Sequence, residues 1–208
     1  LLANIALSIL DEHFAEAWES WGDFNARSRR RRKGMATYRL VRYADDFVVL
    51  VAGTRAHAET LRDEVAAVLR PMGLRLSEEK TTIAHIDEGL DFLGFRIQRR
   101  RQRGSNKRFV YTWPAKKALA SIKAKVRAIT RGGTNQPLAV VLRRLNPVLR
   151  DWANYFRHGV SKATFDYLGA FSWRRVICWL RHKHRRASWK WLRRRYLPGW
   201  RPSDGQVT

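Results

Sequence analysis

Two adjacent aspartates, Asp45 and Asp46, are the side chains of this sequence that point most directly to chemistry. Apolar segments lie on both sides of them, at residues 37–43 and 47–52. Neighbouring carboxylates repel each other, and Mg²⁺ relieves that repulsion because it prefers carboxylate and phosphate oxygens. Two such ions held by paired carboxylates activate a hydroxyl for in-line attack on a nucleoside triphosphate. The alternative is structural, because aspartate is also a common turn residue.

The elements that position this pair follow from the hydrophobic pattern. Residues 37–43 and 47–52 predict two β-strands, with the aspartates at or beside a tight hairpin turn. Helices are predicted over residues 2–21 and 55–70. The basic run at residues 29–34 predicts an exposed loop, whose charges are either solvated or in contact with a phosphate.

Short alternating segments after the second helix predict more strands, so the fold class is α+β with an antiparallel sheet. These segments lie at residues 74–77, 82–86, 92–98 and 109–113.

From Pro114 onward the pattern predicts helices only. Their expected first or capping residues are Pro114, Pro137, Ser161 and Ser188. Within the second of these helices, Pro147 is expected to produce a kink or a restart, because an interior proline loses a hydrogen bond.

Charge is distributed very unevenly along the 208 residues, of which 45% are hydrophobic, enough for a real core. Residues 1–98 carry 14 basic and 15 acidic groups, a net of −1, whereas residues 99–208 carry 28 and 3, a net of +25. Seven of the nine tryptophans fall in the second half. Basic and aromatic residues together indicate a nucleic-acid partner or, less often, an anionic membrane, although at least half of the tryptophans are expected in a helical core.

Several classes of protein are disfavoured by composition. The single cysteine, Cys178, excludes an internal disulfide and fits a reducing compartment. A zinc site with His182 and His184 is disfavoured because no second ligand pair has the required spacing. No apolar stretch is long enough to cross a bilayer, and no signal peptide is recognisable. We therefore expect a cytoplasmic, nucleic-acid-associated protein without a membrane partner. The chain begins at Leu1 within a helical pattern, which indicates a longer protein.

Taken in order, the motifs resemble the reverse transcriptase/maturase proteins of bacterial mobile group II introns. The matching strings in the first half are L-L-A-N-I at 1–5, V-R-Y-A-D-D-F-V-V-L at 41–50, G-L-R-L-S-E-E-K-T at 73–81 and F-L-G-F at 92–95. Further strings look like the maturase segment called domain X: L-N-P-V-L-R-D-W-A-N-Y-F-R-H-G at 145–159, S-W-R-R-V at 172–176 and R-R-A-S-W-K-W-L at 185–192. The resemblance extends over about residues 1–202.

The resemblance implies a domain organisation along the chain. Residues 1–100 correspond to the second half of a polymerase palm, residues 101–202 to a helical thumb and domain X, and residues 203–208 to a tail. It implies that Asp45 and Asp46 bind catalytic Mg²⁺, with Asp45 as the more direct ligand.

Other site residues are also implied by the resemblance. Lys80 corresponds to a palm lysine near the phosphates of the incoming nucleotide, or else it pairs with Glu78 or Glu79. The primer-grip region corresponds to Phe92, Leu93, Gly94 and Phe95, which also fit an ordinary buried strand. The candidates for RNA contact are Arg143, Arg144, Arg150, Tyr155, Arg157, Lys162, Arg174 and Arg175.

One part of the family pattern is missing. In the family, the fingers and the first half of the palm, with another metal-binding aspartate, precede the part that matches this chain. Asp11, Glu12 and Glu16 are predicted on a helix and do not replace that strand.

Two hypotheses therefore stand. The first is an RNA-directed DNA polymerase whose partners are intron RNA, RNA template with DNA primer, deoxynucleoside triphosphates and the missing N-terminal fingers and palm half. This fragment alone is expected to be inactive. The second hypothesis is a non-catalytic RNA-binding maturase fragment.

Overall fold

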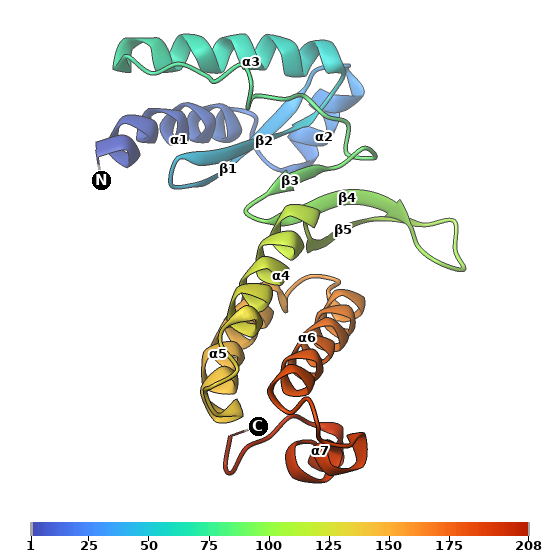
Figure 1. The fold of residues 1–208 in the computed structure, drawn as a ribbon. Coiled ribbons are helices and arrows are strands. Elements are labelled where there is room, and N and C mark those ends of the chain that lie inside the picture. Colours follow the sequence, from blue (N-terminus) through green and yellow to red (C-terminus); the bar gives the residue numbers. More distant parts are fainter. Residues whose placement is uncertain (1, 208) are drawn as a thin grey trace. The chain divides into compact units, whose positions relative to one another are not determined.

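The computed structural model describes residues 2–207, with side chains from residue 4 onward (Figure 1). The chain divides into two compact units between His85 and Ile86. The first unit contains α1 (Leu2–Ser20), α2 (Phe24–Arg32), β1 (Thr37–Tyr43), β2 (Asp46–Ala52), α3 (Arg55–Leu69) and the 3-10 helix η1 (Arg70–Met72). The second contains β3 (Leu90–Phe92), β4 (Phe95–Arg101), β5 (Arg108–Pro114), α4 (Lys116–Arg131), α5 (Leu138–Phe156), α6 (Lys162–Lys183), α7 (Trp189–Tyr196) and the 3-10 helix η2 (Pro198–Trp200).

The predicted α+β class is confirmed, with one antiparallel sheet in each unit. The order is β1-β2 in the first and β3-β4-β5 in the second. The division into palm, helical region and tail at residues 100 and 202 stays a prediction.

In the first unit, α1 packs against both β1 and α3 (Figure 1). The inward side chains form a core because apolar residues recur at helical spacing on α1 and α3 and alternate on the strands. The buried members are Leu7, Leu10, Phe14, Leu61, Val65 and Leu69.

The basic run from Arg29 is helical, so the predicted loop is wrong. Asp23 caps the N-terminus of α2 by accepting a hydrogen bond from the Ala26 amide at 2.7 Å. Arginine is a good helix former, and four arginines in the last turn interact favourably with the helix dipole. Two of these side chains also bind within the unit, because Arg30 donates to the Ala36 carbonyl and Arg31 to the Thr37 hydroxyl.

The strands predicted at residues 74–77 and 82–86 are wrong, because both segments are irregular. The alternation at the first segment is real, since Leu74 and Leu76 pack against the core of the first unit. Alternation shows which side chains are buried, but a strand also needs a hydrogen-bonding neighbour.

The predicted strand at residues 92–98 is divided by a turn. Phe92 pairs with Phe95, so Leu93 and Gly94 form a two-residue connection between β3 and β4. Their φ values are +48° and +77°. Positive φ at both central residues is the requirement of the tight hairpin turn whose twist matches its strands. Leucine rarely adopts this conformation, which explains why the sequence pattern concealed the turn.

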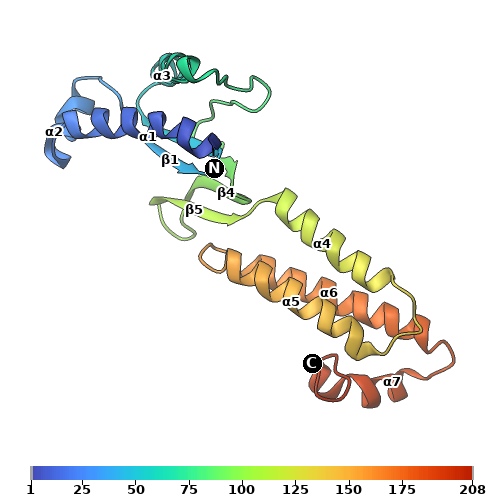
Figure 2. The same ribbon diagram turned by 90° about the vertical axis from the view of Figure 1, so that its left-hand side faces the viewer.

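The helical part of the second unit is built around α4, which packs against both α5 and α6 (Figure 2). Its core brings together apolar stripes of α5 and α6 with residues of α4 and α7. The central members are Val126, Val141, Leu142, Leu145, Val176, Leu180 and Leu192.

Helix α5 continues through Pro147 as one helix, so of the two expected alternatives the restart does not occur. One capping detail differs from expectation. Ser161 does not cap α6 with its side chain but donates a hydrogen bond to the Phe156 carbonyl at 2.7 Å. Ser188 does cap α7, as predicted, by accepting from the Trp191 amide.

The seven tryptophans of the second half differ in burial. Trp179 is buried in the core, and Trp113, Trp152 and Trp173 are half-buried. The remaining three are exposed: Trp189, Trp191 and Trp200.

Truncation of Val126 tests the helical core. Its side chain is 0% exposed, so Val126→Ala is expected to lower the free energy of unfolding by about 2 kcal/mol through lost burial and the cavity left behind. Val160→Ala is the matched control, because Val160 is 62% exposed. Urea unfolding followed by circular dichroism measures both, and equal stability losses in the two variants would contradict this account of the core.

Candidate functional site

The two aspartates lie at the end of the β1–β2 hairpin. Tyr43 and Asp46 form the last pair of the ladder, so Ala44 and Asp45 are the two turn residues. Ala44 has a φ of +55°, a conformation that two-residue hairpin turns require and alanine adopts at some cost. Both carboxylates are exposed. The hairpin predicted from sequence is therefore present, and it presents the acidic pair at its tip.

Arg42 fastens this hairpin end to α1. Its guanidinium forms an ion pair with Asp11 and donates to the Ala44 carbonyl at 2.9 Å. The hydrogen bond with Asp11, together with its charge, raises the pKa of Arg42 above the ordinary value. The turn is thus held against α1, and the Asp11 carboxylate is already paired with a cation. This pairing supports the expectation that Asp11 does not complete the acidic site.

The donor set at the turn fits part of a metal site. Carboxylate oxygens are the ligands that Mg²⁺ prefers, and Asp45 and Asp46 supply two such groups. Among the described residues, no group of three or more His, Cys, Asp or Glu side chains could enclose a metal ion. Asp45 and Asp46 can therefore hold a divalent cation only together with other oxygen ligands, such as phosphates or water.

Lys80 lies on an exposed turn, where its amide donates to the Ser77 carbonyl at 3.1 Å. Across the described part of the chain, its ammonium forms no ion pair with Glu78 or Glu79. The structural alternative predicted for Lys80 therefore lacks support.

The Leu93-Gly94 turn is fixed by two hydrogen bonds, one from α5 and one from the residue that precedes α4. The Tyr155 hydroxyl donates to the Leu93 carbonyl at 2.9 Å, and the Ala115 amide donates to the Gly94 carbonyl at 2.8 Å. A Cβ atom on Gly94 would lie 3.3 Å from the Phe156 ring, so glycine permits the close packing of this turn against Phe156.

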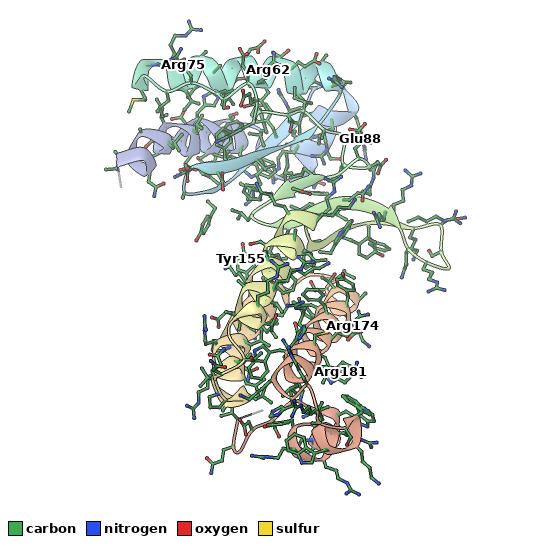
Figure 3. The ribbon with its side chains drawn as sticks, in the orientation of Figure 1. Arg62, Arg75, Glu88, Tyr155, Arg174 and Arg181 are labelled. Carbon is green, nitrogen blue, oxygen red and sulfur yellow. The ribbon has the colours of Figure 1, made fainter. Side chains whose placement is uncertain are left out.

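Aromatic rings continue this contact behind the turn. The ring centroid of Phe95 lies 5.5 Å from that of Tyr155 and 4.7 Å from that of Phe156. Trp152 in turn lies 4.6 Å from Phe156. Phe156 is buried and Trp152 is half-buried. Tyr155 is 51% exposed, so it both supports the turn and keeps a solvent-facing surface (Figure 3).

The predicted RNA-contacting cations are spread over two helices rather than gathered in one pocket. Arg143, Arg150 and Arg157 recur every seven residues, which places them along one side of α5 at intervals of about 10 Å. All three are exposed, as are Arg144 and Lys162. Arg174 on α6 is exposed as well (Figure 3).

Arg175 differs from the other candidates. It is half-buried and donates to the Thr130 hydroxyl of α4 at 3.0 Å, which gives it a structural contact.

A further cationic group between α4 and α6 was not recognised in the sequence. The Lys123 ammonium lies 2.6 Å from the Tyr167 hydroxyl, and this hydrogen bond is the main cause of a lowered Tyr167 pKa. Lys123 and Arg127 also lie over the Phe171 ring. Forty-four positions separate Lys123 from Tyr167, so no local pattern could have joined them.

The residues considered for zinc have other surroundings. Cys178 is exposed, and the His184 ring is stacked on Tyr196 with its Nε2 atom 3.1 Å from the Tyr196 hydroxyl. Burial, with a smaller contribution from Lys183, lowers the pKa of His184. Among the described helices, none is long and apolar enough to cross a membrane.

Two known sequence families match successive parts of the chain. The family described as "Reverse transcriptase (RNA-dependent DNA polymerase)" matches residues 1–97. The family described as "Group II intron, maturase-specific domain" matches residues 119–197. These two regions occur in one chain in this order. The chain belongs to the group II intron reverse transcriptase/maturase family.

Two relatives illustrate this membership. Protein YkfC of Escherichia coli (strain K12) is 37% identical over 135 residues, which cover 57% of this chain and 35% of YkfC. The group II intron-encoded protein LtrA of Lactococcus lactis subsp. cremoris is 37% identical over 62 residues, which cover 29% of this chain and 10% of LtrA. The chain thus spans about a third or less of the length of these relatives.

Removal of one hydroxyl tests how the Leu93-Gly94 turn is held in this family member. Tyr155→Phe keeps the ring contacts but loses the bond to the Leu93 carbonyl, so we expect a loss of about 0.5–1 kcal/mol in stability. The Ala115 amide, which donates to Gly94, should exchange its hydrogen faster. Tyr167→Phe is the control, because it removes a hydroxyl that contacts Lys123 instead. Equal exchange in both variants would show that the Tyr155 hydroxyl does not hold the turn.

Proposed function

We propose that this chain supplies the acidic hairpin of an RNA-directed DNA polymerase and binds intron RNA through its helical region. The observation that carries the first part is the exposed tip of β1–β2, where Asp45 and Asp46 follow one another at a turn fastened by Arg42. The match of residues 1–97 to the reverse transcriptase family supports the same assignment.

In this proposal, Asp45 and Asp46 hold Mg²⁺ together with oxygens of the nucleotide, and Asp45 is the more direct ligand. When bound, the ion supplies charge neutralisation and activation of the primer hydroxyl. Arg42 keeps the turn in place against α1 without touching the reactants. Lys80 places a cation near the nucleotide phosphates, where it stabilises or protonates the departing pyrophosphate. The turn at Phe92, Leu93, Gly94 and Phe95 is assigned to the primer strand.

Two carboxylates do not bridge two metal ions by themselves, because each ion needs several oxygen ligands. We therefore infer that polymerisation requires another carboxylate, from a fingers and palm half on the same or another chain. The partners proposed for the complete enzyme are an RNA template, a DNA primer and deoxynucleoside triphosphates.

The second part of the proposal concerns RNA binding. Residues 86–208 contain 29 basic and 6 acidic residues, and the exposed arginines of α5 are arranged along one side. Such an arrangement favours contact with a phosphate backbone, because each neutralised phosphate releases counterions. The match of residues 119–197 to the maturase-specific family points to intron RNA as the ligand. Promotion of splicing is the expected consequence. If polymerisation is absent, this RNA binding is the function that remains.

Replacement of Asp45 tests the proposed metal site. Asp45→Asn should reduce binding of Mn²⁺, used as a paramagnetic probe, and should abolish any primer extension on an RNA template. Asp63→Asn is the control, because Asp63 is an exposed carboxylate on α3 that pairs with Arg62. Paramagnetic broadening of the Ala44 and Asp46 amide signals measures the first effect on the chain itself. Persistence of that broadening, or of primer extension, in Asp45→Asn would refute the catalytic assignment.

Removal of two arginines tests the RNA surface. Arg143→Ala/Arg144→Ala should weaken binding to structured intron RNA and reduce the slope of log K against log salt by about 1.5, because two phosphate contacts are lost. Arg55→Ala/Arg62→Ala is the matched control: it removes the same charge from α3, where both arginines pair with carboxylates. Filter binding at several salt concentrations provides the measurement. A flat salt response, or equal losses in both double variants, would contradict RNA binding by α5.

A further inference from the structure

The β4–β5 hairpin lies mostly outside both matched families, which end at residue 97 and begin again at residue 119. Its ladder extends from the Phe95–Pro114 pair to the Arg101–Arg108 pair, and residues 102–107 form the tip. Figure 1 shows it as a long ribbon that extends beyond β3. Residues 92–114 contain seven basic residues and no Asp or Glu.

The register gives this hairpin two different faces, because successive side chains of a strand point to opposite sides. One face carries Arg99, Arg101, Arg108 and Val110. Asp87 lies 2.7 Å from Arg99 and 3.5 Å from Arg108, so two of these cations are already paired with a carboxylate.

The other face, called the aromatic face, carries Phe109, Tyr111 and Trp113 at alternate positions of β5, with Arg100 opposite Phe109. The Arg100 guanidinium lies over the Trp113 ring, 4.5 Å from its centroid. The rings of Phe109 and Tyr111 lie 6.5 Å apart. Phe109 is 47% exposed, although a phenylalanine on an ordinary hairpin gains stability by burial.

The surroundings of Arg100 point to an anionic ligand. Its guanidinium is exposed, and its one side-chain hydrogen bond within the described residues is to the Gln98 amide oxygen at 2.9 Å. A guanidinium above an aromatic ring still offers its outer surface and its N–H groups to a base and a phosphate.

We propose that the aromatic face is a stacking platform for an unpaired nucleic-acid strand. Unpaired bases offer their flat surfaces to aromatic rings and to arginine planes, whereas bases within a duplex are stacked on one another. Arg100 and the other basic residues of the hairpin that are not paired with Asp87 contact the phosphates of the same strand. A purely apolar partner is disfavoured by the seven basic residues of the hairpin. RNA and DNA share this chemistry. The platform goes beyond the proposed function, because none of its residues belongs to the acidic turn or to the arginines of α5.

Truncation of Phe109 in the complete 208-residue chain tests the platform. Phe109→Ala should weaken binding of an unstructured oligonucleotide of about 12 nucleotides by about five-fold or more, as loss of one stacked base predicts. Val110→Ala is the matched control, because Val110 is the adjacent residue, is 55% exposed and lies on the opposite face. Fluorescence anisotropy with labelled single-stranded RNA, single-stranded DNA and a duplex of the same length gives the affinities.

Two conservative variants separate stacking from general hydrophobic contact. Phe109→Trp should restore binding because it keeps a flat ring, whereas Phe109→Leu should bind as weakly as Phe109→Ala. If Phe109→Ala loses affinity for only one of single-stranded RNA and DNA, that strand is the ligand of the platform. An equal loss of affinity for both also supports the platform.

The proposal is overturned if Phe109→Ala binds like Val110→Ala, if leucine restores affinity, or if the duplex loses as much affinity as the single strands. It is also overturned if affinity for vesicles of phosphatidylserine falls in Phe109→Ala while affinity for single strands does not. This test is independent of the RNA binding proposed for α5. The loss of single-strand affinity caused by Phe109→Ala should be the same with and without the Arg143→Ala/Arg144→Ala change.

Discussion

Electrostatic self-repulsion is the constraint on which the second unit depends. Residues 86–208 carry 29 cationic side chains against 6 carboxylates, and no small set of ion pairs can neutralise this excess. The apolar stripes of α4, α5 and α6 resolve the conflict, because they bury a common core and leave the cations outside. Many cations also lie over aromatic rings, such as Arg127 over Phe171 and Arg193 over Trp200. A polyanionic partner is therefore favoured by the energetics of the fold itself.

The first unit solves the opposite problem, that of keeping two carboxylates together in water. Asp45 and Asp46 lie at a two-residue turn, where neither has to be buried. Arg42 holds this turn against α1, because its guanidinium pairs with Asp11 of α1 and also donates to the Ala44 carbonyl. The acidic pair is consequently placed by a neighbour that does not neutralise it.

The sequence predicted those features that depend on short-range patterns. The hairpin around Asp45, the helix over Arg55–Leu69 and the cap at Ser188 follow from alternation, helical periodicity and local hydrogen bonding. Residues 74–77 were mistaken for a strand because burial alternates there without a partner strand.

Long-range contacts had no such local signal. The bond from Tyr155 to Leu93 joins positions 62 apart, and the turn that it supports has leucine where glycine is expected. The role of Arg42 in fastening the turn depends on Asp11, 31 positions away. The residue types around Asp45 were therefore enough to predict a candidate site. The distant side chains that hold its turns in place could not be predicted from the sequence.

The left-handed conformation of Leu93 has an energetic consequence for ligand binding. A non-glycine residue at a φ of +48° costs about 1–2 kcal/mol, which contacts elsewhere in the unit must offset. The Tyr155 hydroxyl forms one of those contacts, and Tyr155 lies on α5, the helix with the exposed arginines along one side. A ligand that shifts the C-terminal end of α5 would alter the energy of this turn, and by thermodynamic reciprocity a strand bound at the turn would alter affinity on α5. A strand bound at the turn and RNA bound on α5 would thus be coupled through the Tyr155 hydroxyl and the left-handed backbone of Leu93.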